Sequence, residues 1–126
     1  MNGDFSESER TRSIIGAFFI TYNKLGAGFL ESVYAAALER ELKKKGREVQ
    51  RELSVRVIYD AEPIAWQRLD LVVDGVVVLE LKSCAHLPAK ATRQLHNYLR
   101  ATELSVGLLL HFGERPHVHR VFVRHV

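Results

Sequence analysis

The chain has 126 residues, of which 47% are hydrophobic and 26% charged, and its formal net charge at neutral pH is +3. This length allows one domain spanning residues 1–126 and excludes a second one, while the composition is ordinary for a globular protein and names no function. The single cysteine, Cys84, excludes an intrachain disulfide and fits a reducing cytosol.

The start of the chain is polar and partly acidic, unlike a signal peptide. No purely apolar run approaches the ~20 residues needed to cross a bilayer. We therefore expect a cytoplasmic protein without a membrane partner. The small positive charge is a weak indication of nucleic acid as a partner. Basic residues gather between positions 43 and 51, where they also fit dipole compensation at a helix end.

Two helices are predicted first. Apolar residues recur at helical spacing at positions 14, 15, 18 and 19, which predicts a helix over residues 7–23. Gly26 and Gly28 interrupt it, because glycine tolerates the positive φ angles of a tight turn. A second helix is predicted over residues 29–45, with an apolar stripe on one face and Gly46 at the position of a C-terminal cap.

β-branched residues and turn signals dominate the remainder of the chain. They predict, in order, strands over residues 52–59, 64–73 and 76–82, a helix over 89–102, and strands over 106–112 and 118–123. The strand at 76–82 is apolar on both faces, as expected of a strand covered on both sides. The order α-α-β-β-β-α-β-β predicts a mixed β-sheet flanked by helices, in the α/β class.

Glu80 and Lys82 are charges at the end of this very apolar strand. Because side chains alternate along a strand, the two share one face. An unpaired charge there costs several kcal/mol at least, so something must compensate it. A salt bridge, or a strand end that reaches the surface, explains an isolated pair of this kind.

Asp70, inside the preceding apolar strand, adds a second carboxylate. Across a hairpin that turns at Asp74-Gly75, Asp70 and Glu80 come close together if the loop has three residues, whereas a two-residue turn places them on opposite faces. Two close carboxylates repel each other unless a cation neutralises them. Oxygen ligands favour Mg²⁺ or Mn²⁺, and Lys82 on the same face could stabilise charge developing on a phosphate.

With these residues in view, the chain resembles the GxxExxY proteins, a group of small proteins in the PD-(D/E)XK nuclease superfamily. The resemblance covers nearly the whole chain through pieces that occur in order: 28–34 (GFLESVY), 68–73 (RLDLVV), 79–82 (LELK), 94–99 (QLHNYL) and 107–113 (GLLLHFG). Two departures are Tyr22, where many relatives have histidine, and Ala27, which replaces a common loop proline.

The resemblance implies a restriction-endonuclease-like core and a metal held by Asp70 and Glu80. It also implies that Lys82 is the catalytic lysine and that Glu31 helps to hold the metal. Spacing alone leaves Glu31 either facing inward or capping its helix.

Gln94 and Tyr98 match positions that border the active site in some nuclease branches. We expect Gln94 to be a catalytic residue. We expect Tyr98 to bind substrate, together with the basic residues Lys90 and Arg93 of the same predicted helix. As bare observations, Gln94 and Tyr98 share one helix face, where Tyr98 could simply be packed.

The expected function is that of a metal-dependent hydrolase that cuts the phosphodiester bonds of DNA, less readily RNA, with a metal-activated water. The alternative is a non-catalytic module that binds nucleic acid or protein. A third interpretation is a structural homodimer in which the site residues form a buried ion-pair network. Specificity is expected to come from loops, from formation of a homodimer or from an accessory protein.

Several histidines and the cysteine belong to residue types that can serve other chemistry. His117 and His119 alternate on a predicted strand, but without a third ligand in the sequence they are interpreted as surface residues. His111, in an apolar strand, is interpreted as a hydrogen-bonded histidine. Cys84 lacks the partners of a nucleophile.

Overall fold

The computed structural model describes residues 2–125, with side chains described from residue 8 onward. Three helices and five strands occur in the predicted order α-α-β-β-β-α-β-β. They are α1 (Asn2–Leu25), α2 (Glu31–Lys44), β1 (Val49–Tyr59), β2 (Glu62–Val73), β3 (Val77–Lys82), α3 (Ala91–Ala101), β4 (Val106–Phe112) and β5 (Pro116–Phe122). No helix within residues 2–125 is long and apolar enough to cross a membrane.

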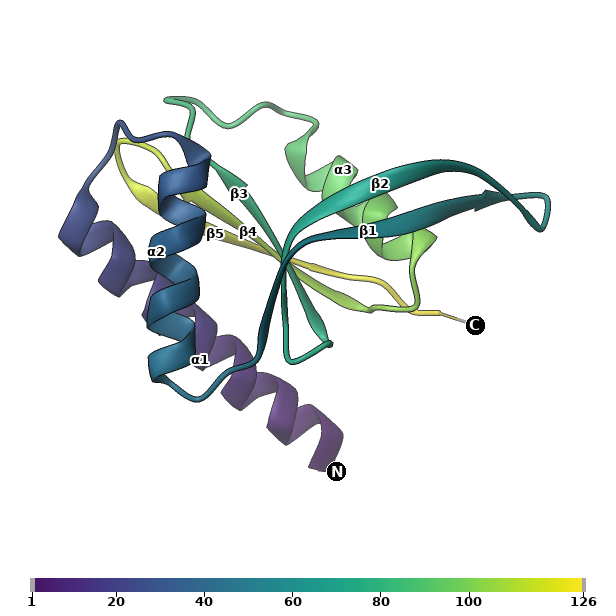
Figure 1. The fold of residues 1–126 in the computed structure, drawn as a ribbon, viewed down its shortest axis with the longest axis horizontal. Coiled ribbons are helices and arrows are strands. Elements are labelled where there is room, and N and C mark those ends of the chain that lie inside the picture. The colour runs from purple at the N-terminus through teal and green to yellow at the C-terminus, as the bar shows by residue number, and fades with distance from the viewer. Residues whose placement is uncertain (1, 126) are drawn as a thin grey trace.

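The strands form a single mixed sheet in the order β1-β2-β3-β4-β5. The pair β3–β4 is parallel and the other pairs are antiparallel. Helices α1 and α2 cover one face and α3 covers the other (Figure 1). Strand β3 lies in the middle of the sheet and is buried on both faces, as its apolar sequence predicts.

Two hydrophobic clusters fill the spaces on either side of the sheet. Phe18 of α1, Tyr34 of α2 and Phe112 of β4 anchor the first cluster, in which Tyr34 stacks on Phe112 at a centroid distance of 4.1 Å. Leu95 and Leu99 of α3 anchor the second. These clusters hold the central strands rigidly, so the ends of β2 and β3 are well positioned to carry a site.

Some element boundaries differ from the sequence prediction. Helix α1 begins at Asn2 rather than at residue 7, and β5 begins two residues early, at Pro116. Strand β1 begins at Val49 rather than at residue 52, because Val49, Gln50 and Arg51 pair with the end of β2. Only Val49 of these three is a β-branched residue, which is too short a signal to predict a strand, so the pairing partner decides.

The β2–β3 hairpin has the odd-length loop that a close approach of Asp70 and Glu80 requires. The last pair is Val73 with Val77, which leaves residues 74–76 as the loop. Asp74 and Gly75 have φ angles of 55° and 67°, the left-handed region that aspartate tolerates and glycine favours. The register of Leu71 opposite Leu79, extended by one step, sets Asp70 opposite Glu80.

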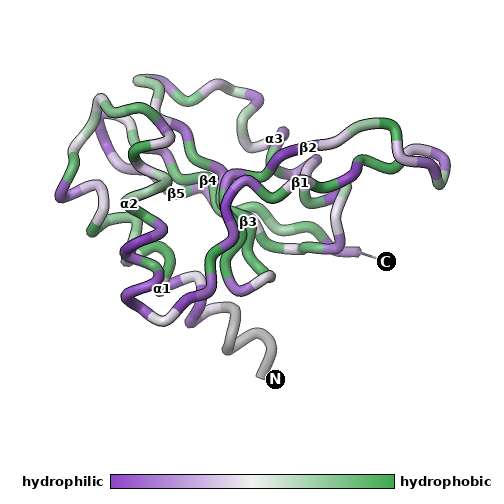
Figure 2. Tube along the Cα trace, viewed as in Figure 1, coloured by the Kyte–Doolittle hydropathy of each residue, from purple (hydrophilic) through white to green (hydrophobic). Residues whose placement is uncertain are grey.

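The two strands separate at this point. Strand β2 pairs with β3 only as far as Leu71 and Leu79, and the remainder of β2 pairs with β1 alone. Glu52, across from Asp70 on β1, has a φ of 55° and interrupts the β1–β2 ladder at one position. The rest of the β1–β2 ribbon projects beyond the body of the molecule (Figure 1). The chain that leads into β1 past this fork is strongly hydrophilic (Figure 2).

Candidate active site

Asp70 lies at the fork between β2 and β3. Its carboxylate Oδ2 accepts a hydrogen bond from the backbone N–H of Leu81 at 2.8 Å. That amide lies two residues beyond the last β2–β3 pair, so it has lost its strand partner. The side chain of Asp70 therefore replaces the missing strand and is held in one orientation by a backbone group.

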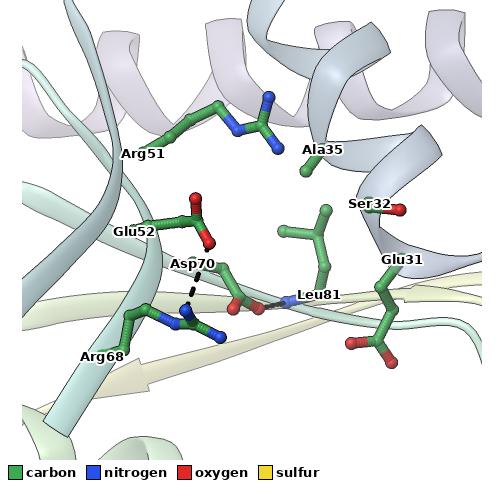
Figure 3. A pocket seen from close by; sticks show the side chains of 8 residues that line it. All are labelled: Glu31, Ser32, Ala35, Arg51, Glu52, Arg68, Asp70 and Leu81. Carbon is green, nitrogen blue, oxygen red and sulfur yellow. Dashed lines mark hydrogen bonds and ion pairs between the residues drawn. The ribbon is translucent and has the colours of Figure 1, made fainter.

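Glu31 approaches the same open edge of β3 from the other side. It is the first residue of α2, and its Oε2 accepts a hydrogen bond from the backbone N–H of Ser83 at 3.3 Å. Figure 3 shows Asp70 and Glu31 on either side of Leu81, with the carboxylate of Asp70 next to the Leu81 nitrogen. The structure combines the two orientations that spacing left open, because Glu31 reaches the Ser83 amide while remaining exposed in the first turn of α2, where its charge complements the helix dipole.

The turn before α2 explains how Glu31 is positioned. Gly28 has a φ of 104°, which a residue with a Cβ rarely adopts. The hydroxyl of Tyr34 donates to the carbonyl of Gly26 and accepts from the N–H of Phe29 at 3.2 Å. Tyr34 thus ties the glycine turn to the start of α2, and the motif 28–34 fixes where Glu31 begins its helix.

Glu80 lies on the α3 side of β3 and is 9% exposed. Burial raises the pKa of Glu80 from 4.5 to about 8, and the neighbouring charge of Asp70 raises it further than the charge of Lys82 lowers it. One carboxylate oxygen, Oε1, is buried without a hydrogen-bond partner among the described residues. At neutral pH the carboxyl group of Glu80 therefore holds a proton beside the carboxylate of Asp70.

Lys82 and Tyr98 complete the surroundings of Glu80. The charge of Lys82 acts on Glu80, yet Lys82 forms no ion pair with it within residues 8–125. Burial raises the pKa of Tyr98, and the charges of Glu80 and Asp70 raise it further, so Tyr98 of α3 lies within range of both charges. Gln94 lies one turn earlier on the same flank of α3 and is half-buried.

A pocket of about 180 Å³ opens at the fork, lined by Glu31, Ser32, Ala35, Arg51, Glu52, Arg68, Asp70 and Leu81 (Figure 3). It brings two arginines, Arg51 and Arg68, to the carboxylates, and neither was predicted as a site residue. Arg68 pairs with Glu52 at 3.3 Å and Arg51 with Glu39 at 3.5 Å. The left-handed φ of Glu52, within β1 next to Arg51, is a feature that a sequence pattern does not show.

Lys90 and Arg93 are not brought to this pocket. Lys90 is the exposed N-cap of α3, and Arg93 lines a separate pocket between α3 and β5. His111 is a buried, hydrogen-bonded histidine as interpreted, with Nε2 at 2.7 Å from the carbonyl oxygen of Cys84. The rings of His117 and His119 stack at a centroid distance of 5.4 Å on β5.

The donor set fits a divalent cation held by few protein ligands. Over the described part of the chain, no three histidine, cysteine, aspartate or glutamate side chains are grouped so as to hold a metal ion. Mg²⁺ does not need three, because it usually takes one or two carboxylates and keeps several waters. Asp70 and the partnerless oxygen of Glu80 would be two such ligands, and Glu31 lines the same pocket as Asp70, whereas Glu80 lies outside that lining.

Comparison with known proteins agrees with this geometry. The family model described as the PD-(D/E)XK nuclease superfamily matches residues 8–123. The chain is also similar in fold to a solved structure titled "Crystal structure of SSO0001", with a TM-score of 0.58 and 16% sequence identity, over 75% of this chain and 50% of that one. It thus spans about half the length of that protein. No curated protein sequence matches. Because the family model covers most of its length, the chain belongs to the PD-(D/E)XK nuclease superfamily.

Proposed function

We propose that this protein is a metal-dependent nuclease that hydrolyses phosphodiester bonds of DNA, less readily of RNA, with Mg²⁺ or Mn²⁺ bound at Asp70 and Glu80. Members of this superfamily are generally nucleases, and they typically use divalent metals. The observation that carries the proposal is the buried carboxyl group of Glu80, with one partnerless oxygen, beside the carboxylate of Asp70.

This arrangement is costly for the folded chain. A buried carboxyl oxygen without a partner costs about 1–3 kcal/mol, and once Glu80 ionises at higher pH the charge of Asp70 adds repulsion. The interpretation as a buried ion-pair network fits poorly, since Lys82 does not pair with Glu80 among the described residues. A group poised for an absent cation explains both features.

The side chains divide the work of hydrolysis among them. Asp70 and Glu80 would hold the metal, with Glu31 close enough to bind one of its waters. When bound, a divalent cation lowers the pKa of a coordinated water and polarises the phosphate. Lys82 faces the same point, and its ammonium group stabilises the negative charge that develops on phosphorus oxygens.

We assign Arg51 and Arg68 to binding the substrate near the phosphodiester bond that is cut. Both line the pocket that holds Asp70 and Glu31. Guanidinium groups bind phosphates through paired N–H donors, so these residues can orient a backbone phosphate towards the carboxylates. Tyr98 and Gln94 border the site from α3 and can contact the sugar or base.

The test is cleavage of labelled DNA and RNA, single-stranded and duplex, by purified protein with Mg²⁺ or Mn²⁺. We expect DNA cleavage that EDTA abolishes and that Lys82→Ala lowers by at least about a hundredfold. Lys45→Ala, which removes an exposed lysine from the end of α2, is the matched control and should cleave normally.

Two results would count against the proposal. Activity that persists in both Lys82→Ala and Glu80→Ala would come from another site or a contaminant. Tight, salt-dependent binding with no cleavage under any metal would instead favour the non-catalytic binding module.

We also propose membership of the GxxExxY group within the superfamily. It is supported by the roles of the motif residues in this chain, in which Gly28 forms the turn, Tyr34 ties it down and Glu31 reaches β3. Gly28→Ala should strain the turn that positions Glu31, so this variant and Glu31→Ala should both lower nuclease activity.

A further inference from the structure

A groove distinct from the candidate active site runs between α3 and β5. Two adjacent pockets, of about 310 and 370 Å³, share His96 and Phe122. The lining also contains four arginines and no acidic residue; they are Arg93, Arg100, Arg120 and Arg124. The chain after β5 closes one end, where His125 Nε2 lies 2.7 Å from the carbonyl oxygen of Leu104. Figure 1 shows this segment passing the C-terminal end of α3.

The groove lies on the opposite flank of α3 from the candidate active site. Helix α3 points Leu95 and Leu99 at the sheet. At 100° per residue, Gln94 and Tyr98 lie to one side of that direction, while Thr92 and His96 lie to the other. Thr92 and His96 line the groove together with residues of β5, and Gln94 and Tyr98 are absent from its lining.

Positive charge is concentrated around this groove. Residues 83–126 contain six lysines and arginines against two glutamates, together with all six histidines of the chain. Residues 1–82, by contrast, have twelve lysines and arginines against thirteen acidic residues. The net positive charge of the protein therefore comes from the part of the sequence that forms α3, β4 and β5.

The arginines of the groove are available for a partner. Several cations elsewhere are paired with carboxylates, as in the pairs Arg10–Asp74 and Lys43–Glu39, while others such as Arg12 and Arg40 are not. Within residues 8–125, none of the four groove arginines pairs with a carboxylate. Four unpaired guanidinium groups around one groove form an electrostatic footprint for a polyanion.

An aromatic ring and an unsatisfied polar atom lie among these charges. Phe122 is 61% exposed and lines both pockets. The Nδ1 atom of His96 is buried without a hydrogen-bond partner among the described residues. An acidic protein partner would use the arginines but not the exposed ring of Phe122. The bases of a single strand of nucleic acid, by contrast, stack on exposed aromatic rings.

We propose that the α3–β5 groove binds single-stranded nucleic acid, with the four arginines on its phosphates and Phe122 stacked against a base. This inference rests on the proposed nuclease function in one respect, because that function identifies the polyanion as nucleic acid. The groove would hold a strand on the far flank of α3 from the scissile phosphate, and so would extend the binding surface beyond the candidate active site.

The experiment measures binding separately from cleavage. Fluorescence anisotropy in EDTA follows a labelled oligothymidylate of about 12 nucleotides, a length within usual site sizes, and a duplex of the same length. Arg120→Ala with Arg124→Ala should reduce the slope of log affinity against log salt by about 0.7 for each phosphate that the variant no longer binds. Phe122→Ala should weaken single-strand binding at least about fivefold, and Phe122→Trp should restore it.

Two control variants remove the same kind of group as the test variants, but at positions away from the groove. Arg12→Ala with Arg40→Ala removes two exposed arginines from α1 and α2, and Ile64→Ala removes an exposed apolar side chain from β2. Both should bind like the parent protein. The groove proposal is wrong if the Arg12/Arg40 control weakens binding as much as the Arg120/Arg124 variant. It is also wrong if the Arg120/Arg124 and Phe122 variants bind with the affinity of the parent. A stronger effect on the duplex than on the single strand overturns its assignment to unpaired strands, as does preferential binding of an acidic peptide.

The outcome is independent of catalysis. If Lys82→Ala abolishes cleavage but binds the oligonucleotide like the parent, groove and active site are separate and both stand. If the protein binds through the groove but never cleaves, the nuclease proposal fails and the groove remains. If it cleaves while the groove variants bind and cleave like the parent, only the groove fails.

Discussion

The carboxylate of Asp70 accepts the hydrogen bond of the Leu81 amide at 2.8 Å, at the point where β2 leaves β3. One side chain thereby serves two purposes. It satisfies a backbone donor that the fork leaves unpaired, and it is held rigidly beside Glu80. The same hydrogen bond makes it possible to separate the chemistry of Asp70 from its structural role.

Asp70→Asn should keep the fold and lose the reaction. The amide oxygen of asparagine can still accept from Leu81, but a neutral side chain binds a divalent cation weakly. We expect cleavage to fall at least about a hundredfold, with the melting temperature changing by only a few degrees. Asp70→Ala is the contrasting variant, which should lose both activity and stability. Normal activity in Asp70→Asn would remove Asp70 from the metal site.

Glu80→Gln should change how stability depends on pH. The unfolded chain releases the Glu80 proton near 4.5, whereas burial holds it to about pH 8 in the folded protein. The folded state thus binds more protons in this window, so the free energy of unfolding falls as pH rises from 4.5 to 8.

Glutamine cannot ionise, so Glu80→Gln should gain on the order of 3 kcal/mol relative to the parent between pH 5 and pH 8. Urea unfolding in EDTA at several pH values measures the difference. Glu103→Gln, at an exposed position, is the control and should follow the parent. Parallel curves for the parent and Glu80→Gln would mean that Glu80 is ionised at neutral pH.

Divalent cations should stabilise the protein more at high pH than at low pH. The metal competes with the proton that Glu80 holds, and a ligand that binds only the folded state raises its stability. We expect Mn²⁺ to raise the melting temperature at pH 8.5 and to have little effect at pH 6. Glu80→Gln and Asp70→Asn should each abolish the rise. An equal rise in these variants would place the binding elsewhere.

Tyr34→Phe should loosen the turn that positions Glu31. The variant keeps the stacking on Phe112 but loses the hydrogen bonds to Gly26 and Phe29. Stability should fall by about 1–2 kcal/mol, and nuclease activity should fall more than stability alone explains. Tyr59→Phe, at an exposed position on β1, is the matched control. Unchanged activity in a destabilised Tyr34→Phe would mean that the turn serves folding only.

Asp74 anchors the β2–β3 loop to the helices. It accepts from Arg10 and Arg47 at 3.0 Å each and from the Glu48 N–H at 2.9 Å. Burial acts to raise the pKa of Asp74, but these hydrogen bonds outweigh it and lower the pKa below 3.8.

Because the folded-state pKa is depressed, this stabilisation is present at neutral pH and is lost as pH falls through the folded value, below 3.8. Asp74→Ala should cost about 2 kcal/mol at pH 7. Asp74→Asn, which retains the left-handed φ, should cost less. Chemical denaturation at pH 7 and in acid measures both. A deficit that persists unchanged in acid would show that the charge contributes nothing.

The sequence by itself determined the order of the elements and the positions of Asp70, Glu80 and Lys82 on the central strands, while their role as site residues stays a prediction. The apolar run of β3 can only be a covered strand, and Glu80 and Lys82 share a face because side chains alternate. The alternation also dictates that Asp70 meets Glu80 only across an odd-length loop, which the pairing of Val73 with Val77 confirms.

Tertiary structure alone decided what surrounds those residues. Glu52 has a left-handed φ within β1, and Arg51 and Arg68 from two paired strands line the pocket beside Asp70, which no local pattern announces. The pKa of Glu80 depends on burial and on a neighbour ten residues away in sequence. The basic groove forms because α3 packs against β5. Local periodicity fixes which face a side chain takes, whereas its neighbours across elements depend on packing of the whole chain.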